Sequence, residues 1–442
     1  MWQRLINAFS DKDIRRKILI SLGLLLIFRL GCYIPVPGIQ YDVIQEIAKE
    51  NTLLGLMSLM SGGALQYGTL FALGVLPFIN SYIIMQLLTL VIPKLDQLSK
   101  QGDEGREKVT MITRYVAIFL ALIQGIGIVV TYHNSGVLET ETLMGADTEW
   151  FTGMFIIIML TAGSCFVMWL SERITEYGIT NGTSLIIFVG IIATFGQALI
   201  TAFGLVSDQP NILWNIFGYL LIIILLFALI VYMDGGERRI KVNYAKMVRG
   251  NKMYGGQSTY IPLKITSGGV MPIIFASAFM MFPTMIVSFL DTTSDLYVFY
   301  YTYLYATGTW TGNAWVGNVV YYLFMFIFVI FFSYFYAQIQ FNPQDVARNL
   351  QQYGGTIQGI RAGRPTVEYL QKVNNRITLF GALFLSFIAI IPALLFNWVG
   401  GDIGLRSAFS ATGMLIVVSV ALELDKQLEA QYMAKHYKGF LK

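Results

Sequence analysis

Charged residues are scarce in this chain. Asp, Glu, Lys and Arg make up only 13% of its 442 residues, whereas hydrophobic residues make up 55%. Soluble globular domains typically carry about 25% charged residues, so this composition excludes an ordinary soluble protein. The apolar surface must instead be buried in lipid, where a helix needs about 20 apolar residues to cross the hydrocarbon. The sequence therefore predicts a membrane protein.

Cysteine and histidine are also rare, with two of each. Cys32 and Cys165 both lie inside apolar stretches, so the chain has no disulfide framework. His133 and His436 stand alone in polar segments, and we interpret them as solvated side chains rather than metal ligands. We therefore expect neither a metal site nor a cofactor.

Motifs for covalent chemistry are missing. The chain has no P-loop, no H-E-x-x-H and no G-x-S-x-G, so neither ATP hydrolysis nor membrane proteolysis by this chain is supported. We predict that it is not an enzyme. Its apolar stretches contain one clearly internal charge, Arg29, which we interpret as a helix-packing or snorkelling residue. Two other classes stay open. A secondary transporter with inverted repeats would need intramembrane carboxylates, and a structural scaffold would not explain the membrane-embedded segment described below.

Ten apolar stretches are long enough to be membrane spans. They are Ile18–Ile34, Thr69–Ile92, Val109–Tyr132, Phe151–Leu170, Ser184–Val206, Trp214–Met233, Gly268–Leu290, Asn318–Gln340, Ile377–Trp398 and Ser407–Leu422. The N-terminus, the even-numbered connections and the C-terminal tail hold 25 of the 30 Lys and Arg residues. Because cytoplasmic loops carry the excess of Lys and Arg, we predict that both termini are cytoplasmic.

The charge-free stretch Leu53–Ile92 is long enough for two crossings, yet the basic loop after it must lie on the N-terminal side. The chain therefore crosses once there, as Thr69–Ile92, and Leu53–Gly68 either enters the membrane and turns back or lies at the interface. Non-helical backbone at that depth is tolerated only where protein or a wet cavity adjoins it. We favour a segment in the external mouth of a central cavity. An amphipathic helix on the outer surface is the alternative.

An internal repeat indicates where a central path runs. The phrase Gly74–Ile79 (GVLPFI) is echoed 195 positions later by Gly269–Ile274 (GVMPII), and both copies interrupt apolar stretches. Matching breaks in two halves of a membrane protein point to a path between the halves. A narrow ring of Ile and Val side chains would dewet and block ions without binding them. It would also contact a passing polypeptide without sequence preference.

The connection Asp234–Ser267 shows strand periodicity. Arg239–Tyr244 and Thr259–Lys264 both alternate polar and apolar residues, and Gly255-Gly256 lies between them. The pattern predicts a two-stranded finger that projects into the cytosol.

Several ordered motifs together resemble the SecY family, the channel-forming subunits of the bacterial Sec protein translocase. The resemblance covers essentially the whole chain. The motifs are Ser61–Leu65 followed by Phe71–Gly74, Pro77–Gln86 (PFINSYIIMQ), Trp169–Phe188 (WLSERITEYGITNGTSLIIF), Asn243–Lys246 with Gln257–Thr259, and Phe341–Pro343 with Gly359–Arg361.

This resemblance implies an all-α polytopic fold with ten transmembrane helices in two pseudo-symmetric inverted halves around a central hourglass pore. The first half, 1–206, would contain helices 1–5 and a short re-entrant plug helix at about 53–68. The second half, 207–442, would contain helices 6–10 and cytoplasmic loops at about 234–267 and 341–375. The implied function is a protein-conducting channel. It would pass unfolded secretory polypeptides across the bacterial cytoplasmic membrane and release membrane segments sideways into the lipid.

The resemblance also assigns roles to residues. The implied pore ring is Val75, Ile79, Thr183, Ile187, Ile274 and Ile416, and the implied plug is Ser61, Gly62, Gly63, Ala64 and Leu65. The lateral gate would include Pro77, Asn80, Gln124 and Pro272. We expect Pro77 and Pro272 to remove backbone hydrogen bonds from the gate helices and make them easier to bend. Thr183 stands where the family usually has an aliphatic residue, so we expect the ring to wet more readily.

The implied partners are SecE, SecG, the SecA ATPase, the ribosome, polypeptides with a signal sequence, and membrane lipids. SecA or the ribosome would supply the driving force. Both would dock on basic loop residues, namely Arg238, Arg239, Lys246, Lys252, Arg361 and Arg364. Such charges suit polyanionic ribosomal RNA by salt-sensitive attraction, without sequence-specific recognition of nucleic acid. Orientation signals and lipid-headgroup contacts are the alternative interpretation of the same residues.

Overall fold

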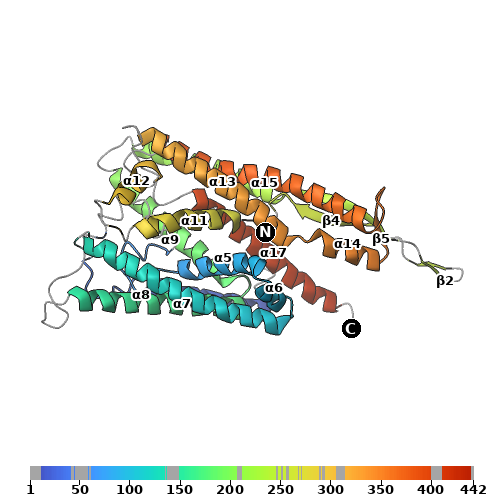
Figure 1. Ribbon diagram of the computed structural model, residues 1–442, viewed down its shortest axis with the longest axis horizontal. Helices are drawn as coiled ribbons and strands as arrows, with labels where there is room; N and C mark the ends of the chain where they lie inside the picture. Colours follow the sequence, from blue (N-terminus) through green and yellow to red (C-terminus); the bar gives the residue numbers. More distant parts are fainter. Residues whose placement is uncertain are drawn as a thin grey trace.

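Long helices dominate the computed structural model (Figure 1). It describes residues 11–40, 44, 58, 61–134, 136, 149–206, 212–244, 247–249, 252–254, 258–266, 268–269, 271–287, 290, 294–304, 314–399 and 411–439. Each of the ten predicted spans overlaps one helix of these residues, in agreement with the predicted helical polytopic fold. The helices are α2 (Lys12–Gly31), α5 (Leu76–Val91), α7 (Asp103–Asn134), α8 (Glu149–Tyr177), α9 (Gly182–Leu205), α10 (Ile212–Asp234), α11 (Met271–Val287), α13 (Ala314–Gln340), α15 (Arg364–Val399) and α17 (Ala411–Gly439).

Six of these helices are each long and apolar enough to cross a bilayer, counted over the described residues: α7, α8, α9, α10, α13 and α15. The pair formed by α5 and α6 (Pro93–Ser99) passes the same test but is bent by 108°. Pro93 opens α6, and because proline has no N–H it ends the hydrogen-bond ladder of α5 there. The chain is a multi-pass membrane protein.

The second span differs from its prediction. Helix α5 begins at Leu76 and not at Thr69, because residues 61–75 form a series of turns. Residues 61–68 of the predicted plug therefore form turns, Ser58 is helical, and residues 53–57, 59 and 60 lie outside the described residues. Residues 61–65 are nevertheless buried in protein. For this part of the chain, the alternative of a helix on the outer surface is wrong.

The helices pack in two groups. In the first group, α7 contacts α5 and α8, while α8 also contacts α2 and α9. In the second group, α13 contacts α11 and α15, and α17 contacts α10 and α15. Contacts between the groups join α5 to α11 and α9 to α10 and α17. In Figure 1, α5, α7 and α8 lie in the lower part of the bundle, and α13 and α15 lie in the upper part.

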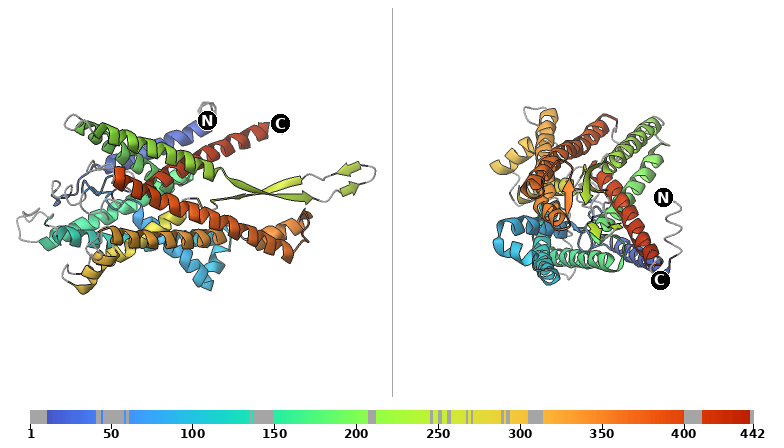
Figure 2. Two further views of the ribbon diagram at one scale, coloured as in Figure 1. Left: turned by 90° about the horizontal axis from the view of Figure 1, so that it is seen from above. Right: turned by 90° about the vertical axis from the view of Figure 1, so that its right-hand side faces the viewer.

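The predicted pairing of two strands in the loop 234–267 is confirmed, and the sheet is larger than expected. Strands β1 (Glu237–Tyr244) and β4 (Ser258–Lys264) pair antiparallel with Ile240 opposite Ile261, and β5 (Gly355–Ile357) of the other long loop pairs with β1. Ile240 and Val242 point into a small core with Leu263, because side chains alternate along a strand. A further hairpin, β2 (Met247–Arg249) with β3 (Lys252–Tyr254), extends beyond the helices (Figure 2).

Two shorter helices complete the described elements. The amphipathic helix α14 (Pro343–Gln352) lies beside β5, at the end of the bundle that carries the finger. The aromatic helix α12 (Asp295–Tyr303) lies at the opposite end (Figure 1). We call these two ends the finger end and the α12 end.

Candidate functional site

The two copies of the repeated phrase have the same backbone geometry. Gly74 and Gly269 adopt φ angles of 54° and 56°, in the left-handed region that glycine tolerates without a Cβ penalty. Two residues after each glycine a helix begins, α5 at Leu76 and α11 at Met271. The sequence repeat is therefore a structural repeat, and α5 and α11 contact each other where the two halves meet.

The expected effect of the two repeated prolines on bending is wrong. Pro77 and Pro272 each occupy the second position of their helix. The N–H groups of the first turn have no intrahelical partner, so a proline there removes no hydrogen bond. Both prolines instead stand at the start of a helix, Pro77 in α5 and Pro272 in α11. Inside α11 the proline is Pro283, which does interrupt the ladder.

The aliphatic members of the predicted ring come together in one hydrophobic cluster. Val75 precedes α5, Ile79 and Ile274 lie in the first turns of α5 and α11, and Ile187 and Ile416 come from α9 and α17. All five belong to the same cluster of buried residues, and the most exposed of them, Ile274, is only 8% exposed. These five side chains belong to α5, α9, α11 and α17 or, for Val75, directly precede α5. Both halves of the chain therefore contribute to one wall, which is entirely apolar.

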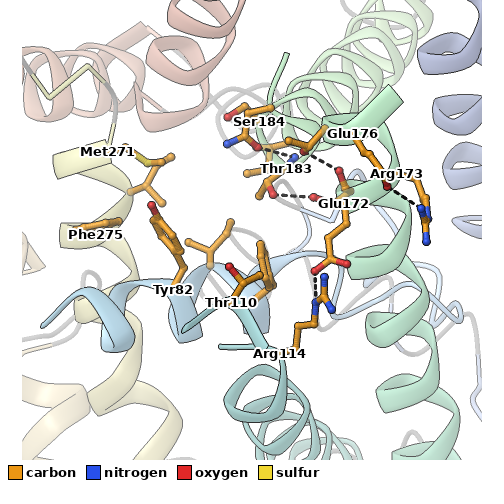
Figure 3. A pocket seen from close by; sticks show the side chains of 17 residues that line it. Tyr82, Thr110, Arg114, Glu172, Arg173, Glu176, Thr183, Ser184, Met271 and Phe275 are labelled. Atoms are coloured by element: carbon orange, nitrogen blue, oxygen red, sulfur yellow. Dashed lines mark hydrogen bonds and ion pairs between the residues drawn. The ribbon is translucent and has the colours of Figure 1, made fainter. Parts of the chain in front are cut away.

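A cavity of about 450 Å³ adjoins this wall. Its lining includes four of the six predicted ring residues: Ile79, Thr183, Ile187 and Ile274. Figure 3 shows Met271 and Phe275 of α11 on one side of the cavity and Thr183 of α9 on the other. Because side chains from both halves enclose one space, a change in the distance between the halves changes its width directly.

The rim of the cavity carries charges that are paired within the protein. Arg114 Nε lies 2.6 Å from Glu172 Oε1, and Arg173 Nη1 lies 2.6 Å from Glu176 Oε2 (Figure 3). These residues come from the beginning of α7 and the end of α8, so the charged rim faces the finger end. Two cations and two anions cancel each other, and the rim therefore favours neither sign of charge on a passing chain.

Thr183 has a hydroxyl partner in the wall. Its Oγ1 lies 2.7 Å from Ser171 Oγ, and its N–H donates to Asn181 Oδ1 at 3.0 Å. Asn181 is the N-cap of α9, so Thr183 is held in the first turn of that helix. The hydroxyl that distinguishes this ring from an aliphatic one is thus partly satisfied by α8, and it has less capacity left for water in the constriction.

For the plugged channel that the resemblance implies, we expect Thr183→Ile to reduce ion leak once the plug is deleted. One hydroxyl contributes about 0.5–1.5 kcal/mol of net hydrogen bonding, so the leak should fall roughly 2- to 10-fold. Conductance measured in planar bilayers checks this. The double variant Thr183→Ile with Ser171→Ala is the matched control, because it removes the second hydroxyl too. An unchanged conductance in both variants contradicts the expectation.

The predicted plug residues form a tight turn packed against α2 and α9. Ser61 Oγ donates to Ser58 O at 3.1 Å, and Gly63 N–H donates to the same carbonyl at 2.8 Å. Thr69 donates through both its N–H and its Oγ1 to Ala64 O, at 3.1 and 2.9 Å. Internal hydrogen bonds therefore satisfy much of this turn, which is what non-helical backbone inside a membrane protein requires.

Two predicted gate residues lie buried with an amide oxygen unpaired. Asn80 of α5 and Gln124 of α7 are each 6% exposed. Neither Asn80 Oδ1 nor Gln124 Oε1 has a hydrogen-bond partner within the described residues. A buried polar atom without a partner costs about 1–3 kcal/mol. Such oxygens weaken the packing of α5 and α7 and favour a rearrangement that gives them partners.

The predicted docking arginines are exposed, and two of them have acidic neighbours. Arg239 lies 3.7 Å from Glu237 on β1, and Arg364 lies 3.2 Å from Glu368 on α15. Exposed pairs of this kind contribute little to stability, so both guanidinium groups remain accessible to a partner. Arg238 and Arg361 are likewise exposed. Lys246 lies outside the described residues, and only the backbone of Lys252, in β3, is described.

The partner of Arg29 was not found from the sequence. Arg29 of α2 was interpreted as a packing or snorkelling side chain, and in the structure its Nη1 donates to the carbonyl of Gly62 at 2.6 Å. The sequence shows that Arg29 is the one charged residue between Ile18 and Ile34. A charge within an apolar span indicates a functional residue, but the sequence does not indicate which backbone atom the side chain contacts.

Comparison with known proteins agrees with this geometry. The SecY family profile matches residues 69–424. The chain is 42% identical over 446 residues to the protein translocase subunit SecY of Streptomyces coelicolor, covering 99% of each chain. It is similar in fold to a structure in which the plug domain of the SecY protein stabilises the closed state of the translocation channel (TM-score 0.67, 20% identity, 94% and 92% of the two chains covered). It is also similar in fold to Sec61 in the canine ribosome–channel complex from the endoplasmic reticulum (TM-score 0.61, 18% identity, 94% and 92% covered).

Proposed function

The chain belongs to the SecY family of protein translocase subunits, and from this membership we propose that it forms a protein-conducting channel. One observation carries the proposal. Four side chains at the predicted ring positions, two of them equivalent in the internal repeat, line one cavity between the two halves of the chain. An apolar constriction of this kind blocks ions when closed and accepts any polypeptide when open.

A signal sequence is the natural opening ligand of this cavity. It is an apolar helix, and the cavity offers apolar side chains from α5 and α11, among them Phe78, Met271 and Phe275. Binding shifts the channel toward the open state only by the difference in affinity between the two states. Separation of α5 from α11 provides that difference, because it widens the cavity that side chains of both helices line. The same separation would open the bundle sideways to lipid for membrane segments.

The two halves, 1–206 and 207–442, act in this mechanism as bodies joined between α9 and α10. The contacts that must break are those of α5 with α11, and those between α9 and α10 can persist. The plug residues Ser61–Leu65 then leave their site, and the polypeptide passes the ring of Val75, Ile79, Thr183, Ile187, Ile274 and Ile416.

Directional work comes from outside the chain, and the chain itself catalyses no covalent step. SecA or a ribosome would dock at the finger end, on Arg238, Arg239, Lys246, Lys252, Arg361 and Arg364. The pairing of β5 with β1 supports a shared docking surface, because it joins the two basic loops into one sheet. SecE and SecG would complete the assembly. The protein would reside in the bacterial cytoplasmic membrane with both termini and the finger in the cytosol.

Transport into reconstituted vesicles tests this function. We expect vesicles that contain the chain with its SecE and SecG partners to protect a secretory precursor from added protease when SecA and ATP are present. The same precursor without its signal sequence is the control and should stay at least about 10-fold less protected, which corresponds to 1.4 kcal/mol of selectivity. Equal protection in vesicles that lack the chain would refute the proposal.

A further inference from the structure

Arg29 places a permanent charge in the last turn of α2, within the first predicted span. It lies about 17 Å along α2 from Ile18 by helical rise, and no other Asp, Glu, Lys or Arg occurs between Ile18 and Ile34. A guanidinium cannot lose its proton in a protein. The charge therefore needs hydrogen-bond acceptors. A segment of the protein that supplies such an acceptor is stabilised in the position in which it does so.

The group that satisfies Arg29 is a backbone carbonyl of the predicted plug. Nη1 donates to Gly62 O at 2.6 Å, a short distance typical of a charge-assisted hydrogen bond. The Arg29 guanidinium also lies 5.4 Å from the centre of the Tyr33 ring on the same helix, where cation–π attraction fixes its direction. One side chain is thus oriented by its own helix and extended toward the turn Ser61–Leu65.

The turn packs closely against α9, and this packing directs the Gly62 carbonyl toward Arg29. Gly62 and Gly63 have φ angles of 72° and 88°. A Cβ on Gly62 would come within 2.9 Å of Gly190 Cα and 3.0 Å of Arg29 Nη1. The backbone of the turn therefore lies between α9 and the guanidinium, with no room for a side chain. Neither the carbonyl nor the charge keeps this partner once the turn moves away.

A second polar contact holds the segment 61–68 at Tyr67, beyond the turn. Gln197 of α9 donates through Nε2 to the hydroxyl of Tyr67, and the Tyr67 ring lies 6.3 Å from that of Tyr33. These contacts are between neutral groups. Charge-assisted hydrogen bonds are roughly twice as strong as neutral ones, so the bond from Arg29 is stronger than the one from Gln197.

We propose that Arg29 is the positioning residue that holds the plug turn in its closed site through the carbonyl of Gly62. This inference rests on the proposed channel function and adds a named residue to it. Opening exchanges the Gly62 carbonyl for water as the partner of Arg29. Loss of a hydrogen bond to a charged group shifts such an equilibrium by about 10- to 100-fold, so Arg29 sets how often the closed channel opens without a signal sequence.

The test measures the position of the plug directly. In a background with Cys32→Ala and Cys165→Ala, Ser61→Cys places one thiol at a residue that is 0% exposed in the closed turn. The rate at which a membrane-impermeant maleimide labels this thiol in intact cells reports how often the turn leaves its site. Ion leak through the purified, reconstituted channel at rest gives a second readout. Both are measured for the parent, Arg29→Leu, Arg29→Lys and Arg15→Leu.

We expect Arg29→Leu to raise the labelling rate and the resting leak by about 10-fold or more. Arg29→Lys keeps the charge and should restore most of the closure. Arg15→Leu is the matched control, because Arg15 is an exposed arginine on the same helix that lies remote from the plug turn. Its labelling and leak should equal those of the parent. If Arg29→Leu fails to insert, Arg29→Gln carries the same test, since its shorter amide cannot make the same contact.

Unchanged labelling and leak in Arg29→Leu, in a channel whose parent still moves a precursor, would overturn the role of Arg29 alone. An equal rise in Arg15→Leu would overturn it as well, because the effect would then follow from any lost charge on α2. If the parent moves no precursor, the proposed function fails, while the labelling rates still decide whether Arg29 holds the turn. The two failures are therefore distinguishable.

Discussion

A single cysteine in place of Ile274 should form a disulfide with a stalled secretory precursor that carries one cysteine, and only when SecA, ATP and the signal sequence are all present. The expected contrast is all or none. Without the signal sequence the polypeptide does not reach the constriction, and Ile274 is only 8% exposed in the closed molecule.

The physical reason is the position of Ile274. It lies in the first turn of α11, lines the cavity together with Ile79 and Ile187, and belongs to the same buried cluster as these two residues. A chain in the ring must pass within contact distance of every ring residue, because an apolar constriction closes around whatever fills it. Replacement of Cys32 and Cys165 leaves the new thiol as the one cysteine of the protein.

Ile286 is the matched control for this crosslink. It lies on the same helix, α11, but is 65% exposed on the outside of the bundle, where lipid would cover it. A cysteine there should give no adduct under any condition. Strong adducts at 286 with none at 274 would mean that the pore axis is wrong and that the repeat marks something other than the path of the polypeptide.

Gly163→Ala should severely destabilise the protein, although it adds one methyl group to an apolar helix. A Cβ at Gly163 of α8 would lie 1.9 Å from the carbonyl oxygen of Leu70. That neighbour is backbone and cannot rotate away, and the adjacent Ser164 Oγ donates to Gly74 O at 3.2 Å and holds the two segments together. Overpacking typically costs about 1–3 kcal/mol, and we expect the upper end or more here. The thermal midpoint of the purified complex in detergent should fall by several degrees.

Gly196→Ala provides the control for that substitution. Gly196 lies inside α9, and a Cβ there would meet nothing within 4 Å. Because alanine favours a helix over glycine by about 1 kcal/mol, this variant should be as stable as the parent or slightly more so. Equal thermal midpoints for the two variants would contradict the prediction. They would show that α8 and the Leu70 backbone can move apart without loss of stability.

Local sequence patterns accounted for much of the architecture. Apolar length predicted the ten helices, because a membrane span is a local property of about 20 residues. Alternation predicted the pairing of β1 with β4, since strand periodicity is equally local. The repeat of Gly74–Ile79 in Gly269–Ile274 predicted two equivalent breaks, and their backbone angles agree. The roles of Thr183 and Ile416 came only through the family resemblance, because nothing in their local sequence marks them.

Other features depended on which segments meet in space. Pro77 was expected to bend a helix, but α5 begins only one residue before it, since the preceding turns pack against the rest of the fold. The hydroxyl of Thr183 was expected to make the ring wet more readily, and the structure gives it a partner, Ser171, on another helix. Arg29 reaches a carbonyl 33 positions away. The sequence by itself determined which stretches hold the ten long helices and the pairing of β1 with β4, because hydrophobic length and alternation are properties of neighbouring residues. Only the tertiary structure decided the partners of each polar group, because a hydrogen bond depends on distances that local sequence does not encode.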